Sequence, residues 1–263
     1  MKKPIKARLV KLVSATFLGF AILLQCSFVP ANLTVYPGTV IPRATTAGHT
    51  NTTTGYTTNN PFKSAAFANS MEIYDSLHLE EIGLSRSVFR MAVKGMEKLY
   101  KAGKLKENVI SIVDFSQPST NKRLYVINLD NYELLYNTWV AHGMRSGKTM
   151  AQVFSNKPSS NKSSLGFYIT GEAYQGSNGY SLKLQGVEKG INDYAYRRAI
   201  VLHGADYVSE GWIASQGYLG RSKGCPAVPL EICQPMIDQI KDGTCLFIYH
   251  PTSTYRNRSP LLR

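Results

Sequence analysis

One cysteine lies in a polar, glycine-containing loop of the kind that makes a thiol reactive. Cys225 follows Gly224, and Arg221, Ser222 and Lys223 come directly before them. The thiolate is the nucleophilic form of cysteine, and nearby cations stabilise it. The loop therefore predicts a thiol whose pKa lies below its ordinary value.

A histidine at the end of an apolar run supplies a matching base. His203 follows the run RAIVL at 198–202 and precedes Gly204, so we expect its imidazole at a strand end beside a flexible turn. An imidazole within hydrogen-bond reach of Cys225 can take the thiol proton or pair with the thiolate. The N–H groups of Gly224 and Cys225 can then converge on a developing oxyanion. The residues alone leave a structural cysteine and an edge histidine as alternatives.

The first 31 residues are typical of a signal peptide. Five cations and no acid precede or enter the apolar stretch Leu12–Leu24, whose 13 residues are short for a membrane-spanning helix. Val29 and Ala31 place small residues where a signal peptidase needs them, so we expect cleavage after Ala31. The sequence therefore predicts an exported protein of the periplasm or cell envelope, attached to a membrane only if the leader stays uncleaved.

The charge and the cysteine count fit an exported protein. The net charge is +13, and residues 32–263 keep +8 once the five cations of the leader are removed. A basic surface suits an acidic polymer such as a cell wall, and no Lys/Arg run with interleaved aromatics indicates nucleic acid. Cys225, Cys233 and Cys245 remain after the leader, which leaves an odd thiol. Cys233 and Cys245 form either a disulfide or two buried free thiols.

The chain divides into four segments. Residues 32–70 are rich in Thr and Asn and carry too few apolar residues for a core, so we expect a disordered spacer. Apolar residues at three- and four-residue steps predict a helical segment at 71–108, capped at Ser85 or Ser87 and ended by Gly103. The catalytic domain is expected at 109–263, after the signal peptide, the spacer and the helices.

Short apolar strands dominate the C-terminal segment. Strands are predicted at 109–115, 124–129, 134–140, 198–202 and 245–249, with glycine, serine and asparagine between them. One short amphipathic helix is expected at 231–241, stopped by Gly243. The fold class is therefore mostly β (α+β), a glycine-rich barrel or sandwich with an N-terminal helical segment.

The strings around both candidate residues resemble one family. The string H-G-A-x-Y-V begins at His203, and R-S-x-G-C-P-A follows it with Cys225 as its cysteine. Together they resemble the L,D-transpeptidase catalytic domain, the YkuD-type murein enzymes, in a divergent branch. The resemblance covers roughly residues 77–249, and it is supported by further strings: VDFSQPS at 113–119, RLYVINL at 123–129, VAHG at 140–143, FSN at 154–156 and SSLG at 163–166.

The resemblance implies a role for each matching residue. Cys225 attacks a donor stem peptide of peptidoglycan at the bond between its third and fourth residues. His203 activates the thiol and protonates the leaving D-amino acid, and the Gly204 carbonyl orients the imidazole. Backbone N–H groups around Lys223, Gly224 and Cys225 form the oxyanion hole. An acceptor amine then resolves the thioester, carbapenem-type drugs acylate the same thiol, and no cofactor is needed.

The sequence departs from the commoner family motif at two places. Lys223 stands where many members have a histidine, and 18 residues separate His203 from Ser222, slightly more than usual. Lys223 either helps to hold the thiolate or points into solvent. His142 either lines the pocket or is a strand-end residue.

Further candidates surround this motif. Arg221, together with Arg197 and Arg198, is a candidate partner for substrate carboxylates. Asp206 is a candidate to orient His203, and no HExxH string or Cys/His cluster indicates a metal.

Three other functions compete with transpeptidation. An L,D-carboxypeptidase shares the active site and uses water as acceptor. A non-catalytic wall-binding module needs neither Cys225 nor His203. A papain-like peptidase carries its cysteine before its histidine, whereas this chain has the reverse order.

Overall fold

The computed structural model describes residues 67–263. The signal peptide expected at 1–31 and nearly all of the spacer expected at 32–70 lie outside these residues. The helices and strands follow one another as α2 (Ser70–Ser76), α3 (Arg86–Lys101), β1 (Val109–Asp114), β2 (Leu124–Asn128), β3 (Glu133–Thr138), β4 (Gly166–Gly176), β5 (Gly179–Gly186), β6 (Val201–Gly204), α4 (Glu210–Gln216), β7 (Ala227–Val228), α5 (Leu230–Ile240), β8 (Cys245–Tyr249) and α6 (Ser253–Arg258).

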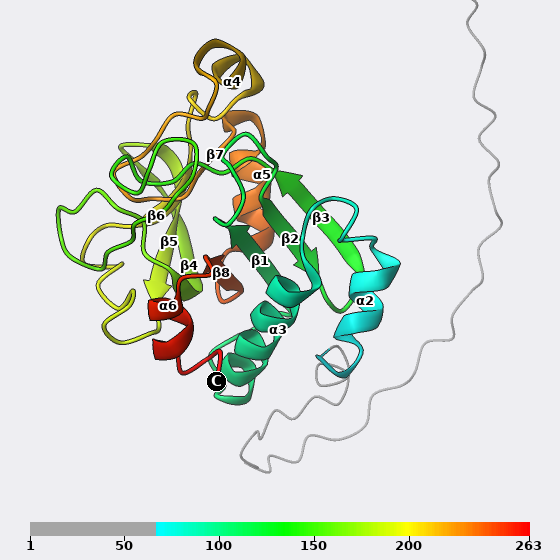
Figure 1. Ribbon diagram of the computed structural model, residues 1–263. Coiled ribbons are helices and arrows are strands. Elements are labelled where there is room, and N and C mark those ends of the chain that lie inside the picture. Colours follow the sequence, from blue (N-terminus) through cyan, green and yellow to red (C-terminus); the bar gives the residue numbers. More distant parts are fainter. Residues whose placement is uncertain (1–66) are drawn as a thin grey trace, which may run out of the picture. The chain divides into compact units, whose positions relative to one another are not determined.

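The eight strands form one curved sheet (Figure 1). Their order is β3-β2-β1-β8-β4-β5-β6-β7, with parallel pairing between β1 and β8 and between β6 and β7. Ala141, just beyond the end of β3, forms an antiparallel bridge with Ala227 of β7, so the two edges of the sheet meet there. The expected mostly β, α+β fold class is therefore confirmed. The closure of the sheet depends on one short contact.

Helix α3 covers β1 and β8 with the apolar face that the sequence predicts. The Ser85 side chain accepts a hydrogen bond from the Val88 N–H and caps the helix. Gly103, with a φ of +66°, follows its last turn. A Cβ on Gly95 would lie 2.0 Å from Cζ of Phe167 in β4. Only glycine therefore lets this ring lie against the helix backbone.

Several elements differ from the strands and helices that local patterns predict. The strand expected at 198–202 begins only at Val201, because Ala199 adopts a φ of +52° within a turn. Helices α4 and α6 were not expected. Ser209 caps α4 by accepting from Trp212 N–H, and Gly217 ends it with a φ of +78°. The segment between His203 and Cys225 thus contains a short helix.

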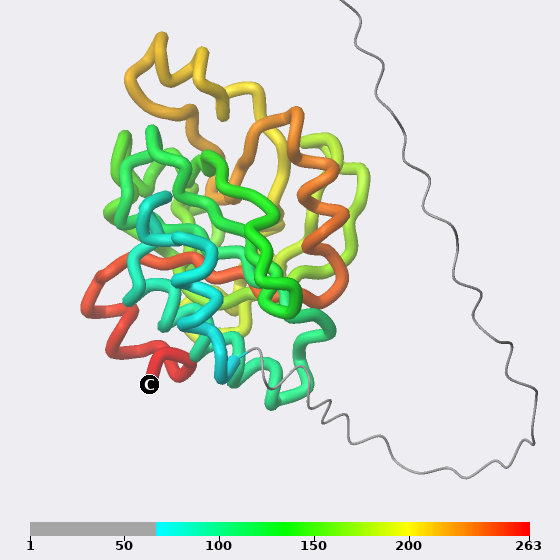
Figure 2. The backbone as a smooth tube through the Cα atoms, turned by 90° about the vertical axis from the view of Figure 1, so that its right-hand side faces the viewer, coloured from blue at the N-terminus to red at the C-terminus, as the bar shows by residue number. Residues whose placement is uncertain are grey.

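The α4 segment and the C-terminal segment lie at opposite ends of the folded part of the chain (Figures 1 and 2). The segment that carries α4 lies at one end in both views (Figures 1 and 2). The C-terminal segment lies against α3 at the other end, where Lys94 donates to the Leu262 carbonyl and Lys98 to the Pro260 carbonyl. Within 67–263, no helix has the length and hydropathy needed to cross a membrane.

A buried carboxylate ties the C-terminal segment to the sheet. Glu188 is 1% exposed and accepts from the Phe167 N–H at 2.7 Å, the Tyr255 hydroxyl at 3.2 Å and the Ser259 hydroxyl. Burial raises the pKa of this carboxyl, while the three donors partly oppose that rise. The ionised form therefore lowers the free energy of unfolding relative to the protonated form.

We expect Glu188→Gln to change how stability depends on pH. A carboxyl whose pKa is raised in the folded state contributes most below its ordinary pKa, and this contribution is lost as pH rises through the folded value. The melting temperature of the wild type should therefore fall relative to Glu188→Gln as the pH rises above the ordinary pKa of a glutamate, about 4.3. Glu133→Gln, on the exposed edge strand β3, is the control. A difference that stays constant as the pH rises would contradict the assignment.

Candidate active site

The parallel pairing of β6 with β7 brings the two candidate catalytic segments together. His203 pairs with Ala227, and the His203 N–H donates to the Pro226 carbonyl at 3.4 Å. One step earlier on β6, the Val201 N–H donates to Sγ of Cys225 at 3.5 Å. The sulfur thus accepts a hydrogen bond from β6 at the position where a backbone carbonyl would accept it if β7 were longer. Because Val201 and His203 are two residues apart, their side chains share one face of the sheet.

The imidazole of His203 is held in one tautomer. Its Nδ1 lies 2.8 Å from the Gly204 carbonyl oxygen, which can only accept. Nδ1 therefore carries the proton, and Nε2 keeps a lone pair that can take a proton from a thiol. A Cβ on Gly204 would lie 2.9 Å from Leu230 and 3.0 Å from Cβ of Cys233. Glycine is therefore what allows α5 to pack behind this carbonyl.

Ser222 fixes the turn that carries the thiol. Its hydroxyl donates to the Cys225 carbonyl at 2.6 Å and accepts from the Gly224 N–H at 3.0 Å. Gly224 has a φ of +127°, and its carbonyl accepts from Ser163 at 3.3 Å. The Gly224 N–H is therefore engaged, which corrects its expected role as an oxyanion donor. In the described part of the chain, the N–H groups of Lys223 and Cys225 donate to no other residue.

The thiol is not acidified by its own loop, so the lowered pKa expected from the sequence is wrong. Burial raises the pKa of the Cys225 thiol, while the Val201 N–H and the Arg198 charge lower it to a smaller extent. Lys223 is exposed, and Arg221 donates instead to the Gly147 carbonyl at 3.1 Å. Neither cation adjacent in sequence therefore lowers the pKa of the thiol, since Lys223 is exposed to water and Arg221 is bound to a backbone carbonyl.

Burial also lowers the pKa of His203, and the bond to Gly204 only partly offsets this. Both shifts disfavour the charged forms. At neutral pH the resting pair is therefore a thiol and a neutral imidazole rather than a thiolate and an imidazolium.

Arg198 holds the loop that lies behind the turn carrying Cys225. Its guanidinium donates four hydrogen bonds to a single loop, and a Cβ on Gly224 would lie 3.2 Å from its Nη2. The acceptors are the Ser155 carbonyl at 2.8 Å, Ser164 Oγ at 2.5 Å, Ser160 Oγ at 3.2 Å and the Lys162 carbonyl at 2.7 Å. These bonds occupy the guanidinium, so it is not available for the substrate carboxylate suggested from sequence.

His142 does not line the site with its side chain. Its Nδ1 lies 2.8 Å from the buried guanidinium of Arg123, and its Nε2 lies 3.3 Å from the Gly147 carbonyl. Because guanidinium only donates, the proton of His142 must sit on Nε2. Burial, followed by the Arg123 charge, lowers the pKa of His142 to about 3. Its carbonyl accepts from the Ser222 N–H at 3.0 Å, so this residue braces the thiol turn through its backbone.

Two residues near the site belong to strings noted in the sequence, which predicts no role for either. Arg123 is fully buried and also donates to the Val140 carbonyl at 2.9 Å and the Gln117 carbonyl at 2.7 Å. Tyr207 follows β6, and a Cβ on Gly220 would lie 2.3 Å from its side chain. Burial and then the charge on Cys225 raise the pKa of Tyr207 to about 12. The string H-G-A-x-Y-V contains Tyr207, but its place beside the thiol depends on how the loop folds.

Other sequence candidates take structural places. The carboxylate of Asp206 accepts from the Tyr207 N–H, and no contact with His203 is present. Cys233 and Cys245 are buried free thiols, one on α5 and one in β8. Among residues 67–263, no cluster of His, Cys, Asp and Glu side chains has the arrangement of a metal site.

Comparisons with known proteins agree with the resemblance noted in the sequence. The family model described as the L,D-transpeptidase catalytic domain matches residues 80–249. No curated protein sequence matches the chain.

Several solved structures are similar to the chain. An L,D-transpeptidase from Mycobacterium smegmatis is 14% identical, with 55% of this chain and 59% of that chain covered and a TM-score of 0.33. L,D-transpeptidase 3 from Mycobacterium tuberculosis is 11% identical, with 55% and 62% covered and a TM-score of 0.34. The helical cell shape determining protein Pgp2 from Campylobacter jejuni is 15% identical, with 64% and 61% covered and a TM-score of 0.37. The chain thus spans about three fifths of the length of these proteins.

The pKa of the thiol should depend on Arg198. We expect the rate of Cys225 alkylation by iodoacetamide to rise with pH at a midpoint above that of an ordinary cysteine, because burial opposes the thiolate. Arg198→Gln should move the midpoint higher, since a stabilising cation is lost, and Arg198→Lys should move it less.

Arg197→Gln removes an exposed neighbouring cation that lies over Tyr194, and it should leave the midpoint unchanged. Cys225→Ala gives the background from Cys233 and Cys245. Equal midpoints for the wild type and Arg198→Gln would show that the guanidinium has no electrostatic effect on the thiol.

Proposed function

Because the chain belongs to the L,D-transpeptidase catalytic domain family, we propose that it is an exported cysteine acyltransferase that crosslinks peptidoglycan. Cys225 forms a thioester with a donor stem peptide, and an acceptor amine on a second stem receives the acyl group. One observation carries this proposal. The β6–β7 pairing puts a half-buried thiol beside β6, the strand that holds an imidazole with Nε2 free to accept a proton.

The first half of the reaction makes the thioester. Sγ of Cys225 attacks the carbonyl carbon between the third and fourth residues of the donor stem, and the thiol proton passes to Nε2 of His203. The carbonyl electron pair moves onto oxygen, where the N–H groups of Lys223 and Cys225 are the available donors. One such donor is often worth about 3–4 kcal/mol of transition-state stabilisation. The C–N bond then breaks as the leaving amine takes the proton from Nε2, which releases a D-amino acid.

The second half reverses these steps with a new amine. The acceptor amine attacks the thioester carbonyl, and its surplus proton passes to Nε2 of His203. The C–S bond breaks, and the leaving sulfur of Cys225 recovers the proton. Since both members of the resting pair are neutral, the imidazole must take the thiol proton before or during attack on the carbonyl.

The surrounding residues act through position. Gly204 holds the imidazole in the tautomer that the reaction needs. Ser222 holds the turn, and Arg198 holds the loop behind it, so the N–H donors keep a fixed direction. Preorganised donors require no rearrangement when charge develops, which is the source of their effect.

Export and inhibition follow from the same proposal. The signal peptide proposed at 1–31 would deliver the domain to the periplasm or cell envelope, where stem peptides occur.

A carbapenem presents a strained lactam carbonyl to the same thiol. Attack by Sγ forms a C–S bond and breaks the lactam C–N bond, and the thiol proton ends on nitrogen, so the enzyme stays acylated.

We expect the purified protein to convert disaccharide-tetrapeptide into crosslinked dimers detectable by mass spectrometry. Cys225→Ala should abolish the product, and His203→Ala should reduce the rate at least about 100-fold because proton transfer is lost. His78→Ala, an exposed histidine outside the sheet, should leave the rate unchanged. Tripeptide alone would indicate an L,D-carboxypeptidase that uses water. No product from well-folded wild type would indicate a binding module.

Meropenem should add covalently to the tryptic peptide that contains Cys225. The adduct should be absent in Cys225→Ala, although Cys233 and Cys245 remain, because those thiols are buried and burial raises the pKa of each. Peptide mapping after incubation measures this. An adduct that persists in Cys225→Ala would assign the nucleophile to another residue.

A further inference from the structure

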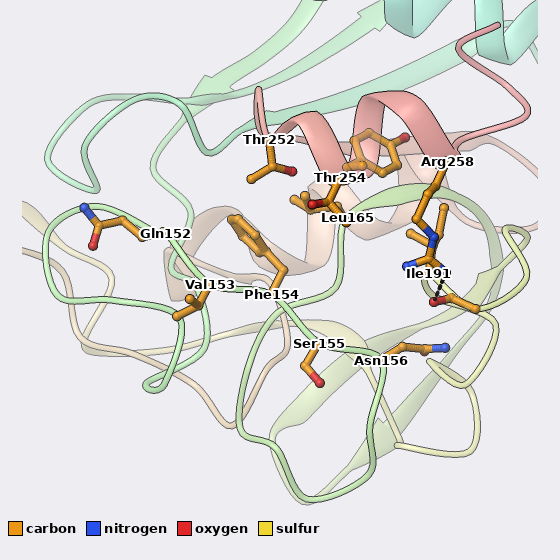
Figure 3. Close-up of a pocket in the computed structure, with 12 residues that line it drawn as sticks. Gln152, Val153, Phe154, Ser155, Asn156, Leu165, Ile191, Thr252, Thr254 and Arg258 are labelled. Atoms are coloured by element: carbon orange, nitrogen blue, oxygen red, sulfur yellow. Dashed lines mark hydrogen bonds between the residues drawn. The ribbon is translucent and has the colours of Figure 1, made fainter.

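A cavity of about 310 Å³ lies on the face where α6 meets two loops, and neither Cys225 nor His203 lines it (Figure 3). One loop carries residues 152–156 and the other carries Gly190 and Ile191. This volume is at the lower end of the range that holds small ligands in proteins. The cavity has no part in the proposed reaction at the thiol.

Apolar side chains form one part of the lining. Phe154, Leu165 and Ile191 contribute to it, and Figure 3 shows the Phe154 ring lying between the two loops and α6. The ring is held from behind, because it stacks on Phe115 at 6.2 Å and lies 5.0 Å from the His250 ring. This part of the cavity is therefore rigid and suits a hydrocarbon group.

The rest of the cavity lining is polar, and its groups can form further hydrogen bonds. Thr252 and Thr254 line the cavity, and neither hydroxyl bonds to another residue in the described part of the chain. Arg258 reaches down from α6 beside Ile191, and its guanidinium makes a single bond within residues 67–263, at 3.3 Å to the Gly190 carbonyl (Figure 3). Four of its five N–H donors thus remain for a ligand.

The charged side chains around the cavity determine which kind of ligand it can bind. Arg258 is charged, and none of the residues that line the cavity is acidic. The nearby carboxylate of Asp193 is already bonded to Nδ2 of Asn156 at 2.6 Å and to the Gly190 N–H at 2.8 Å. A guanidinium binds a carboxylate with two parallel hydrogen bonds. A free amino acid would also bring an ammonium group, for which the lining has no partner.

We infer that this cavity binds the C-terminal carboxylate of a peptide. Arg258 pairs with the carboxylate, the threonine hydroxyls bond to the last amide, and the apolar part holds a small side chain. If the chain acts on stem peptides as proposed, the natural source is a stem other than the one at Cys225. That identification rests on the proposed function, whereas the site itself does not.

The cavity shares a loop with the active site. Ser155 lines the cavity, and its carbonyl accepts from Arg198, which also contacts the thiol turn. A bound peptide would therefore touch the same loop that holds Gly224 in place.

Binding is tested on the full chain carrying Cys225→Ala, so that no thioester forms. The probes are N-acetyl-D-alanine, its amide, free D-alanine and inorganic phosphate, titrated by calorimetry at low salt. N-acetyl-D-alanine should bind at least about 10-fold more tightly than the other three, since a charge-assisted bond and the apolar contact both contribute.

Variants locate the site. Arg258→Gln should weaken binding of N-acetyl-D-alanine at least about 10-fold. Arg256→Gln, on the exposed side of the same helix, should leave it unchanged. Thr254→Phe, which fills the cavity from the surface, should also abolish binding, and melting temperatures confirm that each variant is folded.

Three results would overturn the inference: no binding of N-acetyl-D-alanine, binding that Arg258→Gln leaves intact, or equal affinity for phosphate or the amide. Because the readout is binding to a variant without its nucleophile, failure here leaves the crosslinking proposal untouched. Failure of crosslinking would likewise leave this site standing.

Discussion

The parallel pairing of β6 with β7 is the contact on which the active site depends. It involves only two residue pairs, yet it joins the strand that carries His203 to the turn that carries Cys225. The same short strand β7 also meets the far edge of the sheet at Ala141. The same two-residue strand therefore takes part both in closing the sheet and in holding the active site.

Burial decides the electrostatic state of the pair. Water is partly excluded from both groups, so the pKa of the thiol rises and that of the imidazole falls. Arg198 opposes the first shift without reversing it. A neutral thiol is less prone to oxidation and stray alkylation than a thiolate, because the thiolate is the reactive form. The cost is that the thiol must lose its proton before or during attack, and a single-tautomer His203 is suited to accept it.

Polar networks behind the site support it together with the hydrophobic core. Ser163 receives the Gly143 N–H and donates to Gly224, while Ser146 accepts the Ser163 N–H. Arg123 and His142 complete the support on the other side of the turn. Buried polar groups are costly unless paired, and pairing them through one geometry fixes that geometry. The turn keeps a left-handed glycine in place for this reason.

Local patterns in the sequence were enough for a large part of this protein. Alternation and helical spacing predicted α3, the strands β1, β2 and β8 and the mostly β class, because each rests on neighbours a few residues apart. The types and order of His203 and Cys225, with the strings around them, indicated the family. Ser85 and Gly103 marked the ends of α3 for the same local reason.

The tertiary structure alone decided the rest. The sequence suggested an acidified thiol, a Gly224 oxyanion donor and a free Arg198, and burial or hydrogen bonds formed in the fold corrected each of them. The Ser222 hydroxyl takes the Gly224 N–H, and loop 155–164 takes Arg198. Arg123 became the anchor of His142 only once buried. Desolvation and long-range hydrogen bonds depend on which surfaces meet, and a residue's type and immediate neighbours do not specify that.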